Sequence, residues 1–153
     1  MLIKIIRLGM FAIDGKDKKG RPVLWSKPEF LKKSEGGQQK QRVKQLKIYN
    51  LEKMDKQYPN EGWNFCMDFS KITKNNVDIE YYLFLVKVYM VYYPRSVKNI
   101  FLINIPAIFE DTRKTIVEAM DQELKSRVKF PNYKELIDNH IDAKNLPSFV
   151  PRT

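Results

Sequence analysis

The chain of 153 residues is poor in the side chains that build most metal sites and covalent catalytic sites. It contains one cysteine, Cys66, and one histidine, His140. A single cysteine cannot form an internal disulfide, which favours a reducing compartment. His140 has only Asp138 and Asp142 near it in the sequence. A lone histidine of this kind is far more often a surface residue than a metal ligand, so no metal and no cofactor are expected.

Phosphate-binding glycine loops and long apolar segments are absent as well. Gly36 and Gly37 precede an expected helix but lack the lysine and the spacing of a nucleotide-binding loop. Near the apolar N-terminus the longest uncharged run covers residues 8–13. That run is too short for the core of a signal peptide or for a membrane span. These absences predict a soluble, cytoplasmic protein.

No nucleophile stands beside a general base. Cys66 lies in the middle of an expected strand between bulky neighbours, which indicates a buried, inert thiol. Asp68, at the carboxyl end of the same strand, has two interpretations. It is either a catalytic carboxylate or a hydrogen-bond partner of a neighbouring loop or helix terminus, and the second is favoured. The sequence therefore argues against an enzyme.

Positive charge is present in excess and is unevenly distributed. The net charge is +10, of which residues 1–60 carry +9 and residues 61–153 carry +1. One interpretation is a surface that meets anions, either lipid head groups or nucleic acid. The other is a lysine-rich helix face that only aids solubility. No nucleic-acid-binding motif is present and the aromatic residues do not interleave with the cations, so no nucleic-acid partner is expected.

Strands and helices are expected to alternate along one domain, residues 1–153. After a turn-rich connector at residues 14–22, strands are expected at residues 23–25, 63–70, 99–105 and 127–130. Helices are expected at residues 39–54, 75–93, 111–120, 121–124 and 133–140. This order predicts an α/β, three-layer-like sandwich with a mainly parallel sheet of four to five strands and helices on its faces.

Residues 78–106 combine an apolar helix, a proline stop and an apolar strand. Between residues 79 and 93 only Glu80 and Lys87 are charged. Apolar groups must therefore meet this helix on more than one side. Either the helix lies inside a core, or one of its faces lines an apolar cavity.

Several short motifs, in this order and spacing, resemble the CRAL-TRIO domain, the phosphatidylinositol/α-tocopherol-transfer type of lipid-binding fold. They are GKDKKGRPV at residues 15–23, MDFS at 67–70, YYP at 92–94, INIP at 103–106, SRV at 126–128 and LP at 146–147. The resemblance covers residues 8–149, and among relatives it is strongest to the domains of motile-sperm-domain-containing proteins.

The resemblance implies a monomeric carrier that encloses a hydrophobic lipid between the sheet and a mobile gate helix, here residues 111–120. It implies membrane-to-membrane lipid transfer and peripheral association with an anionic membrane surface. Three basic residues are expected to contact the membrane or the lipid head group: Arg113, Lys114 and Arg127. Ten apolar residues are expected to line the hydrophobic pocket: Phe65, Met67, Phe69, Leu85, Tyr89, Phe101, Ile103, Phe109, Ile116 and Met120.

Three departures from the family pattern keep an alternative open. Arg95 stands where phosphoinositide-binding members carry an acidic residue that pairs with a basic one, here Arg127, so phosphatidylinositol is not the expected cargo. The closing Gly-Gly is replaced from Ser148 onward, and the helical segment that normally precedes the domain is missing. The alternative is a non-catalytic scaffold of the same fold that binds a membrane surface or a protein partner without lipid cargo.

Overall fold

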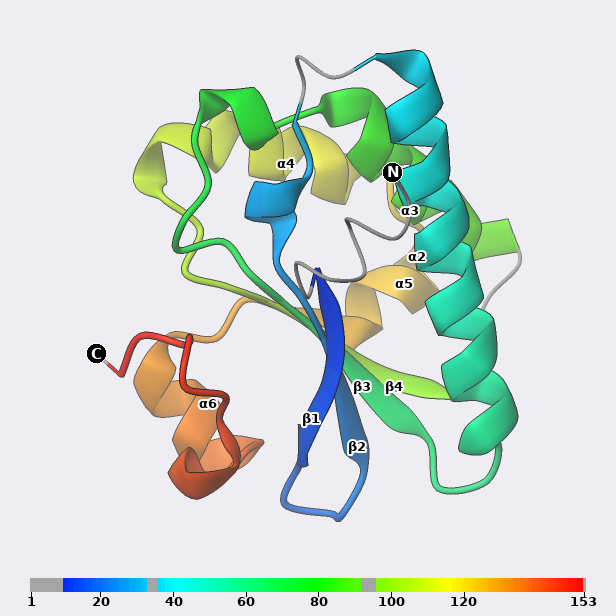
Figure 1. Cartoon of the computed structure of the whole chain (residues 1–153). Helices are drawn as coiled ribbons and strands as arrows, with labels where there is room; N and C mark the ends of the chain where they lie inside the picture. Colours follow the sequence, from blue (N-terminus) through cyan, green and yellow to red (C-terminus); the bar gives the residue numbers. More distant parts are fainter. Residues whose placement is uncertain (1–9, 33–35, 92–95, 153) are drawn as a thin grey trace.

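A computed structural model describes residues 10–32, 36–91 and 96–152. Its centre is one five-stranded sheet in the order β1-β2-β3-β4-β5 (Figure 1). The strands are β1 (Phe11–Lys16), β2 (Pro22–Ser26), β3 (Trp63–Asp68), β4 (Val97–Ile103) and β5 (Val128–Lys129). β1 pairs with β2 in antiparallel fashion, and the other three pairings are parallel. The expected mainly parallel α/β sheet is confirmed.

Five helices and four short 3₁₀ turns lie between and after the strands within the described ranges. The helices are α2 (Gly37–Gln57), α3 (Ile79–Val91), α4 (Glu110–Glu118), α5 (Gln122–Arg127) and α6 (Tyr133–Asn139). The 3₁₀ turns are η1 (Pro28–Phe30), η2 (Lys74–Asn76), η3 (Ala107–Phe109) and η4 (Ala143–Asn145). In Figure 1, α6 and the C-terminal segment lie on the other side of the sheet from α2, α3 and α4.

The two faces of the sheet carry separate apolar cores. The α4 face packs against α2, α3, α4 and α5, and its buried members include Leu24, Phe65 and Ile100 from neighbouring strands. The α6 face is smaller and packs against α6 and the segment that follows it. Its buried members are Val23, Trp25, Cys66, Phe101, Ile103, Leu136, Ile141, Leu146 and Val150.

Local signals explain most of the boundaries. Asp121 caps α5 by accepting a hydrogen bond from the Leu124 amide at 2.8 Å, and Asn132 caps α6 in the same way through Glu135. β4 ends before Asn104, whose φ of +60° takes the backbone out of the extended region. The strand is therefore Val97–Ile103 rather than residues 99–105.

The sequence did not predict β1 as a strand. Residues 14–16, expected to be part of a connector, belong to this edge strand, and only the short turn at residues 17–21 separates it from β2. Four of the six β1 residues are exposed, so no buried alternation marks the strand. The expected helix over residues 75–93 was also too long at its start. Residues 74–76 form η2, and α3 begins at Ile79.

Candidate functional site

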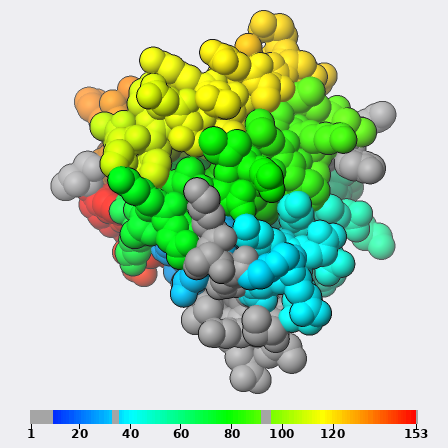
Figure 2. Space-filling model, turned by 90° about the horizontal axis from the view of Figure 1, so that it is seen from above, coloured from blue at the N-terminus to red at the C-terminus, as the bar shows by residue number. Residues whose placement is uncertain are grey.

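An apolar cavity of about 70 Å³ lies beneath α4 on the α4 face of the sheet. In α4, Thr112, Ile116 and Val117 face it, a spacing that places one stripe of a helix against the interior. In the space-filling view, α4 (yellow) lies directly against the green segment that contains α3 (Figure 2). The full lining consists of Phe69, Ile72, Val77, Tyr82, Leu102, Ile105, Phe109, Thr112, Arg113, Ile116, Val117, Met120 and Phe130.

α4 packs on the domain through half-buried side chains, among them Ile116 and Val117. None of its residues is completely buried. Its Arg113 donates from Nε to Oε2 of Glu110 at 2.9 Å and from Nη2 to Oε1 of the same residue. The guanidinium also lies over the Phe130 ring, 4.8 Å from its centroid. Arg113 therefore connects α4 to the chain beyond β5, a contact that must break if α4 moves away.

Two open depressions border the cavity. The first, of about 560 Å³, lies between α2, α3 and α4 and shares Val77, Phe109 and Thr112 with the cavity. At its rim Lys40 forms an ion pair with Asp78 at 3.2 Å. The second, of about 550 Å³, lies between α4 and α6 and shares four lining residues with the cavity: Leu102, Ile105, Arg113 and Phe130. The apolar space under α4 therefore lies between two openings that are lined by both charged and apolar side chains.

Four of the ten residues expected to line a pocket do line this cavity: Phe69, Phe109, Ile116 and Met120. Four others lie in the same core of the α4 face without lining the cavity: Phe65, Met67, Leu85 and Tyr89. Of these, Phe65 and Tyr89 pack against each other, with ring centroids 6.5 Å apart.

The remaining two, Phe101 and Ile103, lie on the α6 face, away from the cavity. The parallel register pairs Phe65 with Ile100 and Cys66 with Phe101. Residues in register share a face, so Phe101 lies on the same face of the sheet as Cys66 and on the opposite face from Phe65. This placement corrects the grouping of Phe101 and Ile103 with Phe65.

The three expected head-group contacts differ in their surroundings. Lys114 is exposed on α4, whereas Arg113 lines the cavity. Arg127 donates from Nη1 to the Val97 carbonyl at 2.7 Å and from Nη2 to Glu123 at 3.3 Å, so it fastens α5 to the start of β4. Arg95 and the YYP motif at residues 92–94 lie outside the described residues.

Buried polar atoms on the α4 face are the feature that the sequence analysis missed. Lys47 is fully buried, and its Nζ lies 3.0 Å from the centroid of the Phe65 ring without a hydrogen-bond partner among the described residues. Burial lowers the pKa of Lys47 well below its usual range. The signal was available, because Lys47 stands midway between Val43 and Leu51 on the apolar stripe of α2.

The phenol oxygens of Tyr82 and Tyr89 are buried in the same way, with no hydrogen-bond partner in the described part of the chain. Tyr82 lines the cavity and Tyr89 does not. No sequence signal separates the two, because α3 is apolar on nearly every side.

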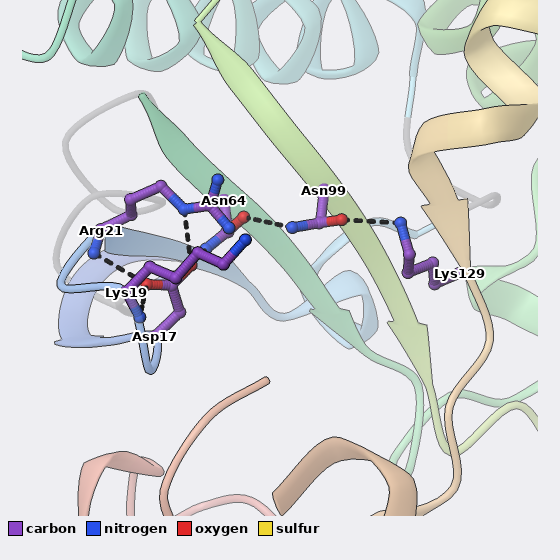
Figure 3. Close-up of polar contacts among 6 residues, drawn as sticks. All are labelled: Asp17, Lys19, Arg21, Asn64, Asn99 and Lys129. Atoms are coloured by element: carbon purple, nitrogen blue, oxygen red, sulfur yellow. Dashed lines mark hydrogen bonds and ion pairs between the residues drawn. The ribbon is translucent and has the colours of Figure 1, made fainter. Parts of the chain in front are cut away.

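On the α6 face, by contrast, hydrogen bonds join the polar side chains in one continuous chain across the strands (Figure 3). Asp17 accepts from Nε of Arg21 and from Nδ2 of Asn64, both at 2.7 Å. Asn99 donates to Asn64 at 3.0 Å, and Lys129 donates to Asn99 at 2.7 Å. Burial alone would raise the pKa of Asp17, but the hydrogen bonds from Arg21 and Asn64 outweigh it and lower the pKa.

The hydrogen-bonded side chains of the α6 face explain the first sequence motif, GKDKKGRPV at residues 15–23, in structural terms. Asp17 also accepts from the backbone amides of Lys19 and Arg21, so it closes the turn between β1 and β2. Asp68 has a comparable role, because it accepts from the Ser70 amide and from Nδ2 of Asn104, both at 3.0 Å. These carboxylates hold loops in place.

Neither a metal centre nor a membrane span emerges from the described ranges. No group of three or more His, Cys, Asp or Glu side chains within them is arranged to hold a metal ion. No helix within them is long and apolar enough to cross a membrane. Cys66 is buried, and burial raises the pKa of its thiol.

Comparison with solved structures identifies the fold. The crystal structure of Sfh5 superposes with a TM-score of 0.67 over 89% of this chain and 51% of that chain, at 16% sequence identity. At this identity the likeness shows the fold alone. The model of the CRAL/TRIO domain matches residues 6–150, and the chain belongs to this family. The family predicted from the motifs is confirmed, and the finer resemblance to motile-sperm-domain-containing proteins stays a prediction.

Two curated relatives match nearly the whole chain. Phosphatidylinositol transfer protein CSR1 of Eremothecium gossypii is 20% identical over 146 residues, which are 95% of this chain and 34% of the relative. CRAL-TRIO domain-containing protein C3H8.02 of Schizosaccharomyces pombe is 24% identical over 147 residues, 94% of this chain and 32% of the relative. The chain therefore spans about a third of the length of these relatives.

Proposed function

We propose that this domain binds a hydrophobic lipid beneath α4 and carries it between membranes, as a monomeric carrier and not a catalyst. The observation that carries the proposal is the apolar cavity beneath α4, a helix with no fully buried residue. Family membership and the name of the relative CSR1 support the same class of function. Residues 1–153 act as one domain in this proposal.

The size of the cavity requires α4 to move when lipid enters. A cavity of about 150 Å³ lined by apolar side chains is large enough for benzene. The cavity of about 70 Å³ beneath α4 is smaller than that, so an acyl chain needs the helix displaced. Displacement breaks the contact of Arg113 with Phe130 and exposes the apolar lining, whereas the pair of Arg113 with Glu110 lies within α4 and moves with the helix. Contact with a membrane offsets this cost, because the lining then meets lipid in place of water.

Basic residues near α4 favour an anionic membrane as the surface of exchange. Lys114 is exposed, and Arg113 loses its contact with Phe130 once α4 moves while it stays paired with Glu110. Each cation near an anionic surface contributes roughly 1 kcal/mol of binding, and the effect fades within a Debye length. Peripheral association of the protein with such membranes is part of the proposal.

A cavity-filling substitution tests the proposal. Ile116→Trp should fill the space under α4 and reduce lipid content and transfer at least tenfold. Lipid content is measured by extraction and native mass spectrometry. Transfer is measured with labelled lipids, phosphatidylinositol among them, moving between vesicles with and without phosphatidylserine. Thr115→Trp is the matched control, because Thr115 is exposed on the neighbouring position of α4 and should leave both quantities unchanged.

A folded wild-type protein that carries no lipid and transfers none would contradict the carrier function. The small volume of the cavity favours one alternative, a scaffold of the same fold without cargo. In that case the protein binds vesicles with no uptake of lipid, and Ile116→Trp and Thr115→Trp behave alike.

A further inference from the structure

Tyr82 is one of three residues with a polar side chain in the lining of the largely apolar cavity, beside Thr112 and Arg113. It projects from α3 into the lining, and its ring packs against Phe69 at 6.2 Å and against Tyr81 at 5.5 Å between centroids. Its phenol oxygen is buried and has no hydrogen-bond partner among the residues the structure describes. A buried hydroxyl without a partner is costly, and a ligand that supplies an acceptor recovers that cost on binding.

The rest of the described lining offers little to satisfy this phenol from within the protein. Thr112 carries the one other uncharged polar side chain there, and Arg113 is held by Glu110 and Phe130. Water is a poor substitute, because a buried water needs two to four polar partners to be well held. An oxygen atom on the ligand needs only this single donor.

The charges around Tyr82 favour a neutral acceptor. Asp78 lies close enough to act on the phenol, but it is paired with Lys40 at 3.2 Å. On the other side the cation Arg113 is paired with Glu110. Burial, with a smaller contribution from Asp78, raises the pKa of Tyr82, so the phenol stays protonated and acts as a donor. Among the residues the structure describes, no uncompensated cation lies beside the phenol, so a phosphate or carboxylate there would be desolvated without a partner.

We propose that Tyr82 determines which lipid is carried, by donating a hydrogen bond to a neutral oxygen of the cargo inside the cavity. The inference rests on the proposed function and adds the chemistry of the ligand: a hydroxyl, ketone or ester carbonyl set within its apolar part. A charged head group, where the lipid has one, stays in the polar depressions outside.

The experiment compares two probes that differ in one oxygen, 2-decanone and decane, in binding measured by headspace partition. For the wild type, the ketone should bind better than the alkane. Tyr82→Phe should weaken binding of 2-decanone about three- to tenfold, the range expected for one net hydrogen bond, and leave decane unchanged. The thermal unfolding midpoint and the circular dichroism spectrum of each variant check that it is folded.

Tyr89→Phe is the matched control, because it also removes a buried phenol without a described partner from α3, but one outside the cavity. It should change the binding of neither probe. One outcome is that the wild type binds both probes and Tyr82→Phe keeps the same preference for 2-decanone over decane. That result would overturn the role of Tyr82 and leave the carrier function standing. So would an equal effect from Tyr89→Phe. Binding of neither probe, with no lipid extracted, would overturn both proposals.

Discussion

The two faces of the sheet satisfy their buried polar groups in opposite ways. On the α6 face, Asp17, Asn64, Asn99 and Lys129 form one hydrogen-bonded chain (Figure 3). On the α4 face, Lys47, Tyr82 and Tyr89 bury polar atoms with no described hydrogen-bond partner, and of the three only Tyr82 lines the apolar cavity. Buried polar groups are normally paired, and exceptions concentrate at functional sites. The comparison agrees with the proposal that the α4 face binds the ligand, and it predicts that the polar chain of the α6 face contributes mainly to stability.

The largest effect is expected from breaking the polar chain of the α6 face. Asp17→Ala leaves Arg21 and Asn64 without their acceptor and should lower the free energy of unfolding by roughly 3–5 kcal/mol, measured by urea denaturation. The neighbouring exposed carboxylate provides the control, since Asp14→Ala should cost little.

The pH dependence of this effect has a defined sign. Because the pKa of Asp17 is lowered in the folded state, its stabilisation is fully present above the unfolded value of about 4. It is lost as pH falls through the folded pKa. The difference in the free energy of unfolding between wild type and Asp17→Ala should therefore become smaller in acid. A difference that stays constant down to about pH 2 would show that the carboxylate charge is not responsible.

On the α4 face, the corresponding substitution should stabilise the protein. Lys47→Met removes an amine with no described hydrogen-bond partner and keeps the packing against Phe65, so the free energy of unfolding at pH 7 should rise by about 1–3 kcal/mol. The unfolded state binds the Lys47 proton more tightly, so wild-type stability should rise with pH from the lowered folded pKa to about 10.4.

The variant Lys47→Met should lack this rise in stability. Lys44→Met serves as a control on the same helix, because the Lys44 side chain is only partly buried and lies over the Phe84 ring. If Lys47→Met destabilises the protein, the buried amine has a partner that favours its charged form.

A smaller effect distinguishes the packed part of the α4 face from its cavity. Phe65→Trp adds volume to a closed core and should cost about 1–3 kcal/mol. Phe69→Trp adds the same volume beside the cavity and should cost less than about 1 kcal/mol. Lipid content should fall in Phe69→Trp and stay near the wild-type level in Phe65→Trp. An equal loss in the free energy of unfolding in the two variants would mean that the cavity cannot accommodate the added volume.

Much of this fold was predictable because its strands and helices carry strong local patterns. The alternation of Trp63, Phe65, Met67 and Phe69 placed one side of β3 correctly. In β4 the residues 100–103 are all apolar, so alternation gives no phase, and only the pairing with β3 shows which side each faces. The edge strand β1 has no such pattern and was missed.

The candidate site was predictable only in part. α4 was expected as the gate because of its position in the family pattern, and Ile116 and Phe109 followed from it. Tyr82 could not be identified, because an apolar helix gives no sequence signal for which residue meets a cavity. That depends on how α3 is rotated against α4, which is set by tertiary packing.

The core of the α6 face has a consequence for the order in which the protein folds. It joins Val23 and Trp25 to Leu136, Ile141, Leu146 and Val150, whereas the last buried member of the α4-face core is Leu124. A chain emerging from the ribosome can therefore complete the α4 face while Trp25 and Phe101 are still uncovered. Such exposed apolar surface is prone to aggregate until residues 136–150 arrive, so synthesis of this segment is the step that protects the nascent domain.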